Sequence, residues 1–183
     1  RKRYDRYHPQ EPTCVYGGAL GRVYVGGRVA AEDERWLAAH RVGLVVSVLP
    51  CGDATRVPLC VGAKYHFDCD RFGDVEQWRE VVEITQGVLA TGYSVLVHCA
   101  AGIHRAPMCA AGILAVLLHL GFDDAYGLIL ESGRYVEPDV FKRHVQRKQP
   151  GLIRRILRVV AALEVAQRPV ASAVFCDPDR GEC

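Results

Sequence analysis

The 183-residue sequence contains no apolar run long enough to cross a membrane. Its longest run, Ala106 to Leu120, is shorter than the ~20 residues that a membrane-spanning helix needs, and no signal-peptide pattern is present. The eight cysteines include no Cys-x-x-Cys pair, and with the seven histidines they show neither zinc-ligand spacing nor a compact disulfide pattern. We therefore expect no metal, no cofactor, no membrane partner and a reducing compartment, the cytoplasm.

An excess of charge of one sign is also missing. The 23 basic and 21 acidic residues leave a formal charge of +2, which by itself does not indicate a nucleic-acid partner. Half of the residues are hydrophobic and 24% are charged, which fits one globular core. We expect a monomer with a single domain over residues 14–166 that includes a C-terminal helix, between a flexible basic arm at 1–13 and a flexible tail at 167–183.

Alternating strand-like and helix-like segments make up this domain. β-branched and alternating runs predict strands at Arg22–Gly26, Leu44–Leu49, Tyr65–Cys69 and Val95–Val97. Apolar stripes predict helices at Ala30–His40, from an N-cap at Asp74 to near Gly92, and at Pro107–Leu120, Asp123–Ser132, Asp139–Gln149 and Leu152–Val165. The alternation predicts an α/β fold, a single domain with a central, mostly parallel sheet flanked by helices.

The stretch VLVHCAAGIHRAPMCAAGIL, residues 95–114, places Cys99 between a strand-like run and a helix-like run. A loop at such a junction directs several backbone N–H groups toward one point, and the helix dipole adds positive potential there. Anions bind such loops, and the same field favours a thiolate over a thiol. A buried structural cysteine needs no such surroundings. We therefore predict a phosphate-binding loop with a reactive sulfur at its floor.

The residues around Cys99 suit such a loop. Small residues let the backbone curl around an anion, and Gly102 can adopt a positive φ. Arg105 can offer its planar fork to two phosphate oxygens, and His98 can orient the loop through side-chain hydrogen bonds. The residues predicted to bind phosphate are Ala100, Ala101, Gly102, Ile103, His104 and Arg105.

The segment HCAAGIHR matches H-C-x-x-G-x-x-R, the signature of cysteine-dependent phosphatases, at each fixed position. The sequence resembles the dual-specificity protein phosphatases: RVYVGGRVAAEDERWLAAHRVGLVVSVL is similar to their opening strand, helix and strand, and LGFDDAYGLILESGRYVEPDVFKRHV to their closing helices. The resemblance covers Val15 to Val145 and implies a dual-specificity phosphatase-like fold. It also implies attack of Cys99 on phosphorus, a phosphocysteine intermediate and its hydrolysis, with phosphotyrosine and phosphoserine or phosphothreonine proteins as substrates.

The same resemblance implies a catalytic aspartate on a mobile loop about 30 residues before the cysteine, which first protonates the leaving oxygen and then activates water. Asp68 lies 31 residues before Cys99 and Asp70 lies 29 before it. Asp68 is the favoured candidate and Asp70 is the alternative. Asp74 is better explained as the cap of the following helix.

Three features depart from most of these relatives. Ala106 stands where most carry a Ser or Thr whose hydroxyl helps the cysteine leave, so the second step is expected to be slow, and R-A-P at 105–107 is similar to the phosphatases of regenerating liver. His104 suggests an alternative substrate class, inositol phosphates or phosphoinositides, although the loop has no Lys.

Ala106 also leaves open a phosphate-binding pseudophosphatase or adaptor. Cys51 and Cys109 are candidates either for ordinary burial or for trapping oxidised Cys99 as a disulfide.

Overall fold

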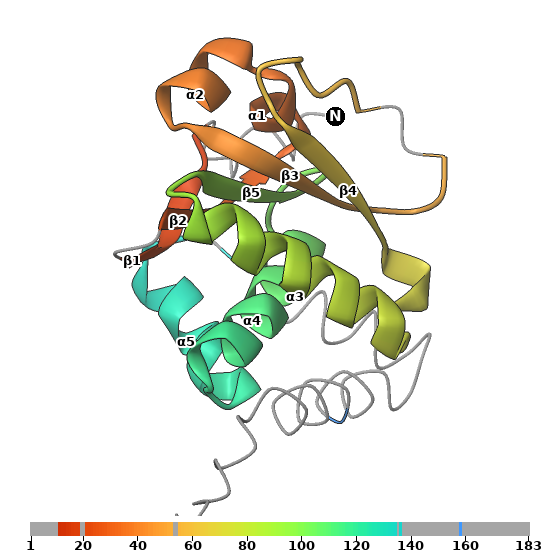
Figure 1. The fold of residues 1–183 in the computed structure, drawn as a ribbon. Coiled ribbons are helices and arrows are strands. Elements are labelled where there is room, and N and C mark those ends of the chain that lie inside the picture. Colours follow the sequence, from red (N-terminus) through yellow and green to blue (C-terminus); the bar gives the residue numbers. More distant parts are fainter. Residues whose placement is uncertain (1–10, 19–20, 53–54, 135, 137–157, 159–183) are drawn as a thin grey trace, which may run out of the picture.

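A five-stranded sheet with the order β1-β2-β5-β3-β4 forms the centre of the molecule (Figure 1). The computed structural model describes residues 11–18, 21–52, 55–134, 136 and 158. The strands are β1 (Thr13–Gly18), β2 (Gly21–Gly27), β3 (Val42–Leu49), β4 (Ala63–Asp68) and β5 (Ser94–Cys99). β1 is antiparallel to β2, whereas β2, β5, β3 and β4 are mutually parallel neighbours. The predicted α/β fold with a mostly parallel sheet is confirmed.

β5 is the central strand, and all six of its residues are buried. Both of its neighbours are parallel, so its two faces must be covered by helices, which explains the aliphatic run in its sequence. In the sheet register, Gly27 of β2 lies opposite Cys99, and Ser47 of β3 lies opposite His98. The carboxyl ends of β2, β3 and β5 therefore meet at the edge of the sheet where the cysteine lies.

Helices cover the two faces of the sheet in two layers (Figure 1). The short helices α1 (Arg28–Glu32) and α2 (Glu34–Ala39) pack on one face, where Leu37 joins a small core with residues of β2, β3 and β5. On the other face lie α3 (Val75–Ala90), α4 (Arg105–Leu118) and α5 (Phe122–Glu131) around the larger core. Every residue of α4 from Ala106 to Val116 is buried, so this helix is the centre of that layer.

α3 begins where its sequence predicts. The carboxylate of Asp74 accepts hydrogen bonds from the backbone N–H groups of Glu76 at 3.0 Å and Gln77 at 3.4 Å, so the predicted N-cap is confirmed. Trp78 on the buried stripe of α3 lies directly against Gly112 of α4, where any side chain would collide with the indole ring. The close crossing of α3 and α4 thus depends on a glycine in an otherwise helix-favouring run.

Two differences separate this architecture from the one predicted. The expected helix Ala30–His40 is two helices, because Asp33 is extended (φ −85°, ψ 93°) and its carboxylate accepts the Trp36 N–H at 3.0 Å, so that Asp33 caps α2. β1 was not predicted, because among Thr13–Gly18 only Val15 is buried and a bulge between Cys14 and Tyr16 interrupts the alternation. The helices expected at 139–149 and 152–165, the tail and the first ten residues of the arm lie outside the described residues, apart from residue 158.

In the described part of the chain, no individual helix combines the length and the apolarity needed to cross a membrane. α4 and α5 meet that test only together, as a pair bent by 117°. Most of α4 is buried within the domain.

Candidate active site

Cys99 is the last residue of β5, and its sulfur receives a hydrogen bond from the loop that follows. The backbone N–H of Gly102 donates to Cys99 Sγ at 3.2 Å, and the cysteine is 4% exposed. α4 begins at Arg105, six residues after Cys99, so the sulfur lies at the junction of a buried strand and a helix N-terminus. An N–H directed at sulfur, together with the positive end of a helix, suits an anionic nucleophile.

Gly102 determines the backbone conformation of this loop. Its φ is +73°, a left-handed conformation that glycine adopts readily and other residues do not, as predicted. A Cβ at this position would lie 2.5 Å from the carbonyl carbon and oxygen of Gly26 and would also collide with the guanidinium of Arg134. Both the backbone conformation and the space around it therefore require a glycine.

The loop is also tied to the end of β2. The backbone N–H of Arg28 donates to the Ala100 carbonyl at 3.2 Å, and Gly27 faces the backbone of Ala100 and Ala101 at close range. Because Gly27 lies opposite Cys99 in the sheet, this contact continues the strand pairing into the loop. The first turn after the cysteine is thus fixed to the sheet before the helix begins.

Arg134, which follows α5, holds the other side of the loop. It is 3% exposed, and its Nε and Nη2 donate to the Gly102 carbonyl at 3.2 and 3.1 Å. Its Nη1 donates to the Glu11 carbonyl at 3.2 Å and to Thr13 Oγ1 at 3.3 Å. Burial lowers the pKa of Arg134 from its ordinary value, and the sulfur of Cys99 opposes that shift. Arg134 lies in the stretch whose sequence is similar to the closing helices of the dual-specificity phosphatases, but the sequence analysis assigned it no role.

His98 and Ser47 form a buried pair beneath the loop. The Ser47 hydroxyl and His98 Nε2 are 2.6 Å apart, and both residues are fully buried. His98 Nδ1 lies 3.4 Å from the Cys99 carbonyl. His98 was predicted to orient the loop, and these contacts place it where it can do so. Ser47 was missed, although a lone hydroxyl within the apolar strand LVVSVL was a signal for it.

Arg105 and Cys69 come together from distant parts of the sequence. Arg105 is the half-buried first residue of α4, and Cys69 opens the short 3-10 helix η1 (Cys69–Arg71) after β4. Burial raises the pKa of the Cys69 thiol, and the positive charge of Arg105 partly opposes that rise. The carboxyl end of β4 lies at the same edge of the sheet as the loop, close enough for the charge of Arg105 to act on Cys69.

The structure places both candidate acids in that segment. Asp68 is the half-buried last residue of β4, and its Oδ1 accepts the backbone N–H of Asp70 at 2.9 Å. Gln77 of α3 fixes the backbone of Asp68, accepting from its N–H at 2.8 Å and donating to its carbonyl at 3.2 Å. Asp70 is exposed. Possible ligand atoms of Asp68, Cys69 and Asp70 lie within 4.8 Å of one another, so these residues are the group that could hold a metal ion in the described chain.

The remaining residues of interest differ in exposure. Ala106 is fully buried at the second position of α4. His104, the residue before the first residue of α4, is half-buried. Cys109 is buried, as expected for an ordinary core residue, and its pKa is raised well above the usual value by burial and by the neighbouring Cys99. Cys51 is exposed, so the expectation of ordinary burial was wrong for it, because it lies in the turn that follows β3.

Comparison with known proteins agrees with this geometry, although no family model matches the sequence. Human dual specificity protein phosphatase 22 is 26% identical over 132 residues, which cover 69% of this chain and 70% of that protein. The crystal structure of human DUSP28 matches with a TM-score of 0.64 at 19% identity, covering 85% of this chain and 97% of that one. A mouse putative dual specificity phosphatase crystallised with zinc tungstate matches with a TM-score of 0.65 at 16% identity, covering 86% and 91%. The chain is similar to dual-specificity phosphatases in sequence and shares their fold, so the resemblance seen in the sequence is confirmed.

Proposed function

We propose that this protein is a cysteine-dependent phosphatase of the dual-specificity type, which hydrolyses phosphotyrosine and phosphoserine or phosphothreonine in proteins. The observation that carries the proposal is the N–H of Gly102 at 3.2 Å from Cys99 Sγ, at the junction of β5 and the N-terminus of α4. The similarity to dual-specificity phosphatases in sequence and fold supports the same activity. The catalytic unit is the domain over residues 14–166, acting as a cytoplasmic monomer.

The reaction has two steps, and each uses residues of this loop. First, Cys99 Sγ attacks phosphorus; the S–P bond forms, the P–O bond to the substrate breaks, and an aspartic acid protonates the leaving oxygen. Then water attacks the phosphocysteine; the same aspartate takes the proton, the S–P bond breaks, and inorganic phosphate leaves. Backbone N–H groups from Ala100 to Arg105 and the Arg105 fork stabilise the equatorial oxygens in both transition states.

Asp68 or Asp70 supplies the acid. Asp68 remains the favoured residue, since Gln77 fixes its backbone and it lies at the end of a strand that ends beside the loop. Asp70 follows on the exposed face of η1. Asp68 and Asp70 therefore both remain candidates for the general acid. The kinetics of Asp68→Asn and Asp70→Asn distinguish them.

A panel of substrates tests the function and its alternatives. We expect Cys99→Ser to abolish phosphate release from an aryl phosphate and from tyrosine, serine and threonine phosphopeptides. The serine hydroxyl is not ionised at neutral pH and is a much weaker nucleophile than a thiolate. Inositol phosphates and phosphoinositides in the same panel test the alternative substrate class suggested by His104. Turnover of these compounds in preference to every phosphopeptide would replace the proposed substrate class.

The adaptor alternative is tested by binding and turnover in the same protein. An adaptor would bind a phosphopeptide without releasing phosphate, and Cys99→Ser would then leave its properties unchanged. The presence of the cysteine and of Arg105 argues for turnover, because a protein that only binds phosphate has no need of a nucleophile. Binding without release by the wild type would overturn the proposed enzyme.

A further inference from the structure

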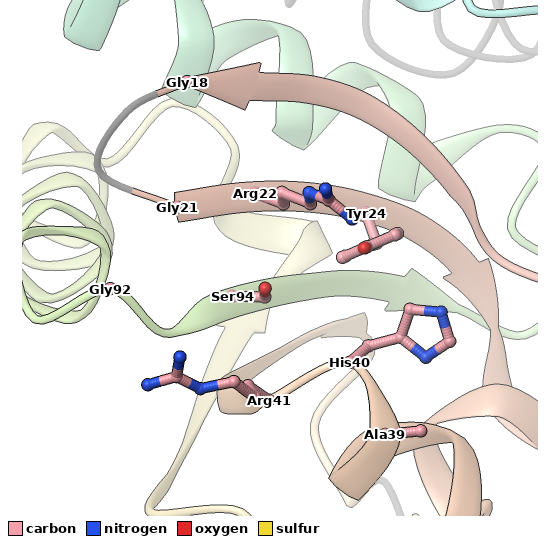
Figure 2. Close-up of a pocket in the computed structure, with 9 residues that line it drawn as sticks. All are labelled: Gly18, Gly21, Arg22, Tyr24, Ala39, His40, Arg41, Gly92 and Ser94. Carbon is pink, nitrogen blue, oxygen red and sulfur yellow. The ribbon is translucent and has the colours of Figure 1, made fainter.

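A polar pocket lies at the amino-terminal ends of the parallel strands, the end of the sheet opposite Cys99 (Figure 2). Its volume is about 470 Å³. Arg22 near the start of β2, Ser94 at the start of β5 and Arg41 just before β3 lie in that order across it, because β5 runs between β2 and β3. Five residue steps along β5 separate Ser94 from Cys99, or roughly 16 Å, so this pocket is distinct from the proposed active site.

Both arginines of the pocket are exposed, and neither has a carboxylate partner among the described residues. The Arg22 guanidinium is hydrogen-bonded to the hydroxyl of Tyr24, which raises the pKa of Arg22. The Arg41 guanidinium lies over the ring of Tyr93, with 5.2 Å between its central carbon and the ring centroid. Within the described residues neither arginine forms an ion pair, and none of the described lining residues is acidic. Their charges are therefore available to an anion.

A serine hydroxyl and a histidine ring complete the pocket. Ser94 is 6% exposed and lines the pocket, and its hydroxyl has no hydrogen-bond partner in the part of the chain that the structure describes. His40 Nδ1 lies 2.8 Å from the Trp36 carbonyl, which can only accept, so this nitrogen carries the proton and Nε2 of the neutral ring is a hydrogen-bond acceptor. The ring is fixed by stacking on Trp36, with centroids 4.1 Å apart. The Ser94 hydroxyl is accessible from the pocket, so it can donate to a ligand bound there.

The backbone of Arg41 supports a role for its side chain. Its φ is +51°, in the left-handed region, at the position just after the C-cap of α2. Glycine is the usual residue there, because a Cβ is strained in this conformation. The Arg41 carbonyl accepts the Ser94 N–H at 2.8 Å, so the strained residue is joined directly to β5. Strain of this kind is commonly retained where a side chain is needed.

We propose that this pocket binds a phosphate monoester. Two guanidinium groups and a hydroxyl offer donors to a tetrahedral phosphate, and no acidic side chain among the described lining residues opposes it. The volume exceeds that of a phosphate group, so the site has room for the carbon-bearing part of the ligand. The assignment is independent of the proposed catalytic activity, because it uses none of the residues of the Cys99 loop.

Phenyl phosphate titrated into the full-length Cys99→Ser protein tests the site by backbone amide NMR. We expect saturable shifts at Gly92, Ser94 and Gly21, separate from those of the Cys99 loop at Gly102, and no such shifts with phenol. In the double variant Arg22→Gln/Arg41→Gln, the dissociation constant of phenyl phosphate measured at the amides of Gly92, Ser94 and Gly21 should rise about tenfold or more, because two charge-assisted contacts are lost. The constant read at Gly102 should stay the same, which separates this site from a failure of the proposed active site.

The matched control is Arg35→Gln/Arg56→Gln, which removes two exposed charges that do not line the pocket. It should leave the dissociation constant at Ser94 unchanged. Any of three results would overturn the proposal. The first is that the amides of Gly92 and Ser94 do not shift at all. The second is that the Arg22→Gln/Arg41→Gln variant binds phenyl phosphate as tightly as the protein with both arginines, and the third is that the control variant loses as much affinity as the pocket variant. If the double pocket variant does not fold, Arg41→Gln alone applies the same test, because it leaves the contact between Arg22 and Tyr24 in place.

Discussion

Two hydrogen bonds join the guanidinium of Arg134 to the carbonyl of Gly102, from Nε at 3.2 Å and from Nη2 at 3.1 Å. The same side chain reaches the Glu11 carbonyl and Thr13 Oγ1, so it links the loop of Cys99 to the segment that leads into β1. Gly102 in turn donates its N–H to Cys99 Sγ. The position of the N–H that contacts the sulfur thus depends on a residue 35 positions after Cys99.

Arg134→Lys should therefore reduce both stability and activity, although it keeps the charge. Lys cannot make the paired contact with the Gly102 carbonyl and the contacts with Glu11 and Thr13 together. We expect the free energy of unfolding to fall by about 2–3 kcal/mol and kcat on an aryl phosphate to fall about tenfold or more. Urea denaturation and steady-state kinetics measure the two effects. Arg79→Lys on the exposed face of α3 should change neither, and wild-type kcat in Arg134→Lys would contradict the positioning role.

Ser47→Ala should weaken the support of His98 without changing the loop itself. The substitution removes the hydroxyl 2.6 Å from His98 Nε2, and loss of this buried hydrogen bond typically costs about 1–3 kcal/mol. We expect a lower free energy of unfolding in urea and a lower kcat, with KM nearly unchanged because no residue that touches substrate is altered. Ser47→Thr keeps the hydroxyl and should restore part of kcat, whereas equal loss in both variants would indicate a packing effect alone.

Thr85→Val should have the opposite effect on stability. The Thr85 hydroxyl on α3 is fully buried and has no hydrogen-bond partner in the described structure. Replacing it with a methyl group of similar size removes the cost of burying an unpaired polar atom, which is about 1–3 kcal/mol. We expect a higher free energy of unfolding in urea and an unchanged kcat. A loss of stability would mean that the hydroxyl has a partner that the described residues do not include.

The loop of Cys99 could be predicted from sequence because its determinants are local. Spacing fixes which backbone N–H groups surround the cysteine, and the strand and helix on either side are strongly patterned. Gly102 was predicted from the same spacing, and its φ of +73° agrees. Asp74 likewise caps a helix whose stripe begins four residues later with Trp78.

The contacts that hold the loop could not be predicted in this way, because they join residues far apart in the sequence. Arg134 meets Gly102 only after α5 has folded back on α4, and Ser47 meets His98 only through the register of β3 against β5. The break at Asp33 was missed for a local reason. An acidic residue within a helix-like sequence is equally consistent with the first turn of one helix and with the N-cap of a second helix. Here Asp33 is the N-cap of α2.

Asp68→Asn and Asp70→Asn should differ in their pH profiles. The general acid must be protonated, so its loss removes the fall of kcat/KM at high pH and lowers kcat by about a hundredfold on poor leaving groups. A good leaving group needs less protonation, so the loss on an activated aryl ester should be smaller. We expect this pattern for Asp68→Asn, with Asp70→Asn close to the wild type. The reverse result would assign the acid to Asp70. Asp74→Asn is the control, because it changes the cap of α3 and the ion pair with Arg71 but neither candidate acid.

Ala106→Ser should speed the second chemical step. Ala106 is fully buried in the first turn of α4. The resemblance to dual-specificity phosphatases implies that a hydroxyl at this position helps the sulfur leave as the S–P bond breaks. If hydrolysis of the phosphocysteine limits turnover, the wild type should release a burst of phenol near one equivalent and then turn over slowly. Ala106→Ser should raise the steady-state rate severalfold and reduce the burst. Ala110→Ser, which adds a buried hydroxyl one turn later, should change stability without changing the ratio of burst to steady state. Rapid turnover without a burst in the wild type would mean that this protein completes the second step without a hydroxyl at position 106.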